Sequence, residues 1–139
     1  MPLSPLAVEL LKTRAPLKGS PYVFHSDSKK GYMDQPRGTL DKVAAVAGMH
    51  LSAHDMRRTF TNIALAVCRI GKFETDLLTG HKPKTEDVTA SHYLDTANLK
   101  WLHREAQQIS DWIEGQGREA AIEAAIAAGE NVIPLHRTA

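Results

Sequence analysis

Three short groups of side chains in this sequence are able to do chemistry, and they follow one another along the chain. His54 and Arg57 lie three positions apart, so on a helix they share one face. Gly80-His81 comes next, and His92-Tyr93 follows it. An arginine holds an anion through a planar fork of N–H groups, a histidine exchanges protons near neutral pH, and a tyrosine offers an oxygen nucleophile.

Each group taken alone has an ordinary structural interpretation. A His-x-x-Arg pair on a helix is more often a solvated surface pair, and a Gly-His after a helix is usually a C-cap followed by a polar residue. A single tyrosine near a helix end usually packs through its ring and keeps its hydroxyl in water. The order and spacing of all three groups are therefore more informative than any one of them.

In combination, the three groups resemble the motifs of the tyrosine recombinases, also called phage-type integrases. That family carries an H-x-x-R box that often continues as R-R/H-T-F, then a G-H, then the nucleophilic tyrosine. Here the motifs read His54-Asp55-Met56-Arg57-Arg58-Thr59-Phe60, Gly80-His81 and His92-Tyr93. Pro2-Leu3-Ser4 and Ser20-Pro21-Tyr22-Val23-Phe24 also look like the stretch that precedes the box in the family. The resemblance covers residues 1–114.

The resemblance implies a site-specific DNA recombinase that breaks and rejoins strands through a 3′-phosphotyrosyl bond. Tyr93 would be the nucleophile, and Arg57 would hold the phosphate oxygens bidentately. His54 and His81 would hydrogen-bond the phosphate or carry a proton. The implied partner is double-stranded DNA, bound by a homo-tetramer of the full-length enzyme, and no metal or other cofactor is expected.

Three further basic residues are candidates for contacts with the DNA backbone. Arg58 follows Arg57 directly, and Lys82 and Lys84 flank Pro83 in the loop before Tyr93. Basic side chains bind phosphates electrostatically. A solvated loop is the alternative interpretation of the two lysines.

The sequence also departs from the family pattern. The family uses an earlier arginine and a lysine on a β-hairpin, and the first basic residues here, Lys12 and Arg14, fall on an expected helix and do not match them. The spacing to Tyr93 is two or three residues longer than the commonest pattern. We therefore expect residues 1–114 to be the C-terminal part of a catalytic domain, inactive by itself. The alternative is a non-catalytic helical module that binds DNA or protein, such as a decayed or truncated recombinase.

Charge is distributed unevenly along the chain. The formal net charge is only +1, but residues 1–104 carry a balance of +5 and residues 105–139 a balance of −4. A mildly basic body with an acidic tail is compatible with nucleic acid on the body, although many unrelated domains have the same balance.

Composition limits the class of protein. The 139 residues are 42% hydrophobic, enough to form a core, and no run approaches the roughly 18 apolar residues of a membrane-spanning helix. Cys68 is the single cysteine, so an intramolecular disulfide is impossible. We expect a cytoplasmic protein, because the start carries no basic-then-apolar leader.

Hydrophobic spacing and helix-capping residues predict a mostly α fold with little or no β structure. Ser4 and Ser52 are expected helix N-caps, and Gly48 and Gly80 are expected helix stops. The expected helices cover residues 5–14, 36–47 or 39–47, 54–69, 73–78, 86–94, 96–114 and 118–128. A short extended segment is expected at 21–24.

The last part of the chain is expected to be separate from the rest. Gly115 and Gly117 are predicted to interrupt the helix and act as a hinge, which sets a boundary between residues 1–114 and 115–139. We expect residues 118–136 to dock on another protomer or to fold back onto the same site. A frayed C-terminus is the alternative.

A metal site is the weakest alternative for the histidines. His50 and His54 form H-x-x-x-H, which on one helix places two ligands on one face. Ser52 is expected to cap a helix between them, and the glutamate of a zincin motif is absent. We therefore expect no metal.

Overall fold

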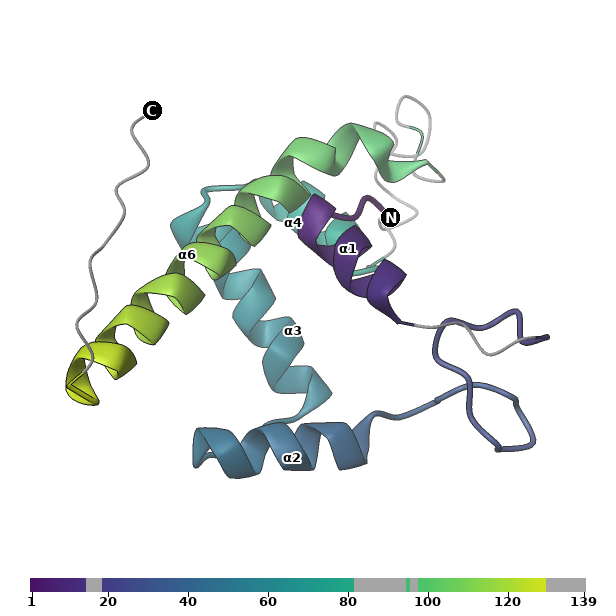
Figure 1. The fold of residues 1–139 in the computed structure, drawn as a ribbon. Helices are drawn as coiled ribbons and strands as arrows, with labels where there is room; N and C mark the ends of the chain where they lie inside the picture. Colours follow the sequence, from purple (N-terminus) through teal and green to yellow (C-terminus); the bar gives the residue numbers. More distant parts are fainter. Residues whose placement is uncertain (15–18, 82–94, 96–97, 130–139) are drawn as a thin grey trace.

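A computed structural model of the chain describes residues 1–14, 19–81, 95 and 98–129. Within these ranges it is mostly α-helical, with five α-helices and no β-strand, as the sequence predicts (Figure 1). The elements are α1 (Pro5–Thr13), α2 (Arg37–Ala47), α3 (Ala53–Asn62), a π-helical turn η1 (Ile63–Val67), α4 (Lys72–Leu78), a 3-10 turn η2 (Leu99–Leu102) and α6 (His103–Ala127). An isolated β-bridge joins His25 to Tyr32.

Two serines begin helices as predicted. The Ser4 hydroxyl accepts a hydrogen bond from the backbone N–H of Ala7 (3.3 Å), and Pro5 occupies the first helical position. Ser52 forms a reciprocal capping box with Asp55 at the start of α3. Both caps satisfy backbone N–H groups that have no partner inside the helix.

The predicted helix over 54–69 is interrupted in the structure. It remains α-helical only to Asn62 and continues as η1, in which the Cys68 N–H donates to the Ile63 carbonyl (2.8 Å). The Ile70 N–H then donates to the Ala64 carbonyl (2.9 Å). Ile63 and Ala64 within this wider turn and Ile70 directly after it are all buried in the core.

The core lies where η1, α4, η2 and the first half of α6 meet. Leu102 and Ala64 are 0% exposed, and Ile109 is 1% exposed. Leu77 and Leu78 of α4 complete this cluster together with Ile63 and Ile70. Figure 1 shows α2 at the far end of α3 from this cluster, and α2 buries no residue. The core therefore fixes α4 and holds α3 at its C-terminal end, and these two helices carry the candidate site described below.

A polar contact ties the N-terminus to α6. The hydroxyl oxygens of Ser4 and Ser110 lie 2.9 Å apart, and Ser110 binds the Glu114 carboxylate at 3.0 Å. Ser4 is buried, so its hydroxyl needs these partners. Ser4 therefore both caps α1 and attaches this helix to α6.

The predicted hinge at Gly115 and Gly117 is wrong. α6 runs without a break from His103 to Ala127, and it joins the two predicted helices into one. Glycine costs only about 1 kcal/mol in a helix interior, and neighbouring contacts offset this cost. Arg118 pairs with Glu114 (3.9 Å), within an alanine-rich stretch that favours helix. The boundary expected between residues 114 and 115 therefore falls inside a helix.

The buried face of α6 ends in its first half, since Ile109 is buried while Ile113, one turn further on, is 45% exposed. The predicted helix over 86–94 and the end of the tail lie outside the described residues. Among the helices that are described, none is both long and apolar enough to cross a membrane.

Leu102→Ala should lower the free energy of unfolding by about 2–5 kcal/mol, because it leaves a cavity beneath η2 and α6. The measurement is urea denaturation followed by circular dichroism. Val46→Ala on α2 is the control, because Val46 is 92% exposed and its loss should stay within about 0.5 kcal/mol. Equal effects of the two substitutions would contradict this account of the core.

Candidate functional site

Arg57 and His81 meet at one residue, Thr79. The Nη1 group of Arg57, on α3, donates a hydrogen bond to the backbone carbonyl of Thr79. The hydroxyl of Thr79 lies 2.8 Å from Nδ1 of His81. The arginine of the first motif and the histidine of the second are therefore neighbours in space.

The end of α4 positions His81 through its backbone. Gly80 has a φ of +78°, and its N–H donates to the Leu77 carbonyl (3.0 Å). The His81 N–H reaches back to the Asp76 carbonyl (2.8 Å). These two bonds define a Schellman motif, which requires the left-handed backbone that glycine adopts most easily. The Gly-His pair is thus a helix end that holds a histidine in a fixed place.

The Thr79 hydroxyl lies within hydrogen-bond distance of three groups. Its oxygen is 2.9 Å from the carbonyl oxygen of Thr75, 3.1 Å from that of Asp76 and 2.8 Å from Nδ1 of His81. The hydroxyl has one proton, so when this proton goes to a carbonyl oxygen, Nδ1–H of His81 is the donor to the hydroxyl. In that tautomer Nε2 remains for a ligand, as an acceptor when the ring is neutral and as a donor when it is protonated.

The capping box holds the start of α3, where His54 lies, and leads to Arg57 one turn later. The Asp55 carboxylate accepts from the Ser52 hydroxyl (2.6 Å) and the Ser52 N–H (3.0 Å). These hydrogen bonds lower the pKa of Asp55, first the one from the side chain and then the one from the backbone, with smaller help from the charges of His50 and His54. The carboxylate form is therefore the one that secures the helix start.

The basic side chains of α3 remain accessible. His54, Arg57 and Arg58 are all exposed. His54 and Arg57 share a face of the helix, whereas Arg58 points about 100° further round it. In the part of the chain that the structure describes, Thr79 is the hydrogen-bond partner of the Arg57 guanidinium. The other N–H groups of the guanidinium can therefore reach a phosphate that approaches from solvent.

The predicted nucleophile Tyr93 and the predicted DNA-contacting Lys82 and Lys84 lie outside the described residues. The convergence of Tyr93 with Arg57 and His81 stays a prediction. Sequence reasoning did not single out Thr79, which contacts both site residues. Its one signal was its position directly before the Gly-His pair.

The histidine pair considered for a metal is divided by the helix cap. Ser52 is the N-cap of α3, so His50 precedes the helix and is not one turn from His54 on a shared helical face. Within the described ranges, no three histidine, cysteine, aspartate or glutamate side chains gather closely enough to hold a metal ion.

Comparison with known proteins adds no relative. No protein-family model matches the chain, and searches of curated proteins and of solved structures also give no match.

Gly80→Ala should destabilise the chain by about 1–2 kcal/mol, because residue 80 has a left-handed backbone. A Cβ at this position would meet no other atom within 4 Å, so the cost comes from the backbone alone. Urea denaturation measures it. Gly117→Ala is the matched control, and it should stabilise α6 by up to about 1 kcal/mol. If both substitutions lowered, or both raised, the free energy of unfolding, the left-handed backbone at residue 80 and the helical backbone at residue 117 could not both be right.

The contribution of the Asp55 cap to stability should disappear in acid. Since the pKa of Asp55 is lower in the folded chain, the unfolded chain takes up the proton first. The stabilisation is complete above the ordinary value of 3.8 and is lost as the pH falls through the lower folded value. The measurement is the difference in unfolding free energy between the wild type and Asp55→Asn across this range. A difference that does not shrink on acidification would contradict the capping role.

Proposed function

We propose that this chain carries catalytic residues of a tyrosine-type site-specific DNA recombinase. The observation that supports this proposal best is the shared contact of Arg57 and His81 with Thr79. In the recombinase interpretation, the arginine of H-x-x-R and the histidine of Gly-His must act on the same phosphate. A chance occurrence of the two motifs would not require them to be neighbours.

The chemistry fits these groups. A phosphodiester gains negative charge on its non-bridging oxygens as it is attacked, and Arg57 offers several N–H donors in a fork that matches those oxygens. Nε2 of His81 and the imidazole of His54 are able to hydrogen-bond the same phosphate. Thr79 holds one N–H of Arg57, so the guanidinium is positioned before DNA binds.

The proposed reaction conserves the energy of the broken bond. The Tyr93 phenol loses its proton and its oxygen attacks phosphorus, the bond to the 5′ oxygen breaks, and that oxygen leaves as a hydroxyl after it takes up a proton. A 3′-phosphotyrosyl bond remains. Attack by a new 5′ hydroxyl reverses these steps and reseals the strand, so no ATP is needed.

The proposal extends to DNA binding and assembly. Arg58, Lys82 and Lys84 would contact the DNA backbone, and the full-length enzyme would act as a homo-tetramer. Residues 118–136 would dock on a neighbouring protomer. Because α6 continues through Gly115 and Gly117, the docking segment up to Ala127 would bind the neighbouring protomer as the end of this one helix. Ile122 and Ile126, 36% and 60% exposed, are the apolar residues available there.

Tyr93→Phe should abolish covalent attachment to a nicked suicide DNA duplex and leave DNA binding nearly unchanged. The test uses a recombinase that contains this chain together with the earlier arginine and the hairpin lysine, and the 139-residue chain alone should give little product. Denaturing electrophoresis detects the covalent complex. Tyr22→Phe is the matched control, because it removes another phenol hydroxyl and should retain the product.

Arg57→Ala in the same enzyme should slow covalent attachment by about 100- to 1000-fold, because it removes donors that stabilise transition-state charge. Arg57→Lys keeps the charge without the fork and should recover only part of the rate.

Undiminished covalent product from Tyr93→Phe would contradict the recombinase assignment. DNA binding without any covalent product from the unsubstituted enzyme would favour the non-catalytic module instead.

A further inference from the structure

The segment between α1 and α2 exposes aromatic side chains that the proposed catalytic residues do not use. Tyr22 and Phe24 are 42% and 47% exposed, although large aromatic side chains gain most from burial. Five residues line a shallow hollow of about 270 Å³ that we name the aromatic hollow: Tyr22, Val23, Phe24, Tyr32 and Met33. A surface of this kind indicates a binding site for a flat apolar group.

A short turn holds the rings in place. The Met33 N–H donates to the Phe24 carbonyl (2.8 Å), and the Ser26 N–H donates to the Gly31 carbonyl (3.1 Å). Gly31 has a φ of +73°, and the Tyr22 ring lies beside it, since a Cβ at residue 31 would sit 3.5 Å from Tyr22 Cε2. The rings of Tyr22 and Tyr32 contact each other at a centroid distance of 5.1 Å. The hollow therefore exists before any ligand binds.

Cations border the hollow on two sides. The Arg14 guanidinium lies 4.8 Å from the centroid of the Phe24 ring, and its Nε donates to the Val23 carbonyl (3.0 Å). The Lys30 ammonium lies 5.9 Å from the centroid of the Tyr32 ring, and Lys29 next to it is exposed. Lys30 also pairs with Asp34, but both side chains are more than half exposed, and such pairs contribute little.

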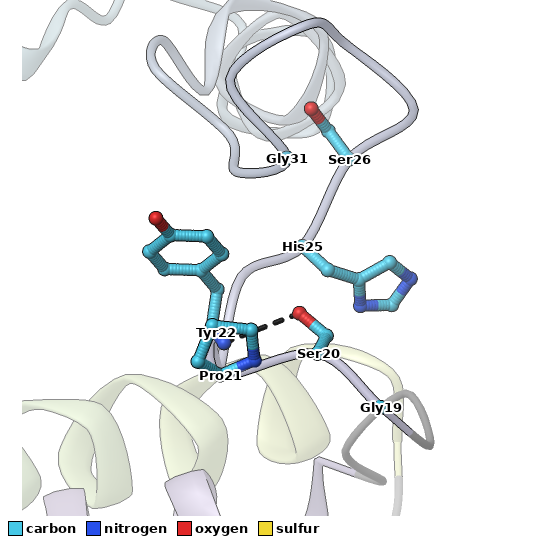
Figure 2. A pocket seen from close by; sticks show the side chains of 7 residues that line it. All are labelled: Gly19, Ser20, Pro21, Tyr22, His25, Ser26 and Gly31. Atoms are coloured by element: carbon cyan, nitrogen blue, oxygen red, sulfur yellow. Dashed lines mark hydrogen bonds between the residues drawn. The ribbon is translucent and has the colours of Figure 1, made fainter.

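A second, more polar hollow shares Tyr22 with the first, and Figure 2 shows the residues that line this second hollow. Its lining includes Ser20, whose hydroxyl accepts from the Tyr22 N–H (3.2 Å), and His25. Nδ1 of His25 is buried and has no hydrogen-bond partner among the described residues.

We propose that the aromatic hollow binds unpaired nucleotides of a single DNA strand. The bases would stack on Tyr22 and Phe24, and the phosphates would lie against Arg14 and Lys29. The positive charges that border the hollow favour a nucleic acid over an apolar peptide, because phosphates would pair with these charges and an apolar peptide would not. Duplex DNA keeps its base faces inside the stack, so the hollow would select strands that have separated. This inference extends the proposed function but does not depend on Arg57 or Tyr93.

Fluorescence anisotropy of a labelled oligothymidylate of about 12 nucleotides tests the proposal on the full chain. Phe24→Leu and Tyr22→Leu should each weaken binding by about 10-fold or more, because leucine keeps apolar volume but loses the stacking face. Tyr22→Phe keeps the ring and should bind like the wild type. Circular dichroism establishes that each variant is folded.

Three results would overturn the proposal: no binding of the oligothymidylate by the wild type, equal affinity for an abasic strand of the same length, or an equal loss of duplex binding in Phe24→Leu. An abasic strand bound about 10-fold more weakly supports it. A recombinase that contains this chain, binds the single strand and forms no phosphotyrosyl bond would support this inference while contradicting the proposed function.

Discussion

The candidate site depends on the backbone and side chain of one threonine at the end of α4. The carbonyl of Thr79 accepts a hydrogen bond from Arg57, and its hydroxyl is hydrogen-bonded to Nδ1 of His81. The carbonyl is available to Arg57 because a helix leaves its last carbonyl groups without internal partners. The Gly80 turn that ends the helix brings His81 back toward those groups. The turn that ends α4 therefore also brings the residues of the candidate site together.

The core explains why this threonine is well placed. Leu77 and Leu78 are buried in one cluster with Leu102 and Ala64, so apolar packing fixes the last turn of α4. The π-helical turn after α3 buries Ile63 in the same cluster. α3 and α4 are therefore fixed relative to each other by apolar packing, and Arg57 reaches across between them. The exposed faces of α2 and of residues 19–33 take no part in this packing.

The sequence allowed helix ends to be predicted where local chemistry decides them. Ser4, Ser52 and Gly80 act through bonds within a few residues, and the structure has helix boundaries at all three. The hinge at Gly115 failed because a glycine permits a bend without requiring one, and its neighbours favour helix. The π-helical turn and the role of Thr79 depend on contacts between distant segments, which no local pattern encodes. For the site, the sequence indicated Arg57 and His81 but not the residue that joins them.

In the proposed recombinase, Tyr93 attacks the phosphate that Arg57 and His81 hold. Mass spectrometry tests this attack on the protease-digested covalent complex that the recombinase containing this chain forms on a suicide DNA duplex. We expect one modified peptide, with a nucleotide joined through its 3′ phosphate to Tyr93. A nucleotide on Tyr22, Tyr32 or any other side chain, or strand cleavage without a covalent peptide, would contradict the role of Tyr93.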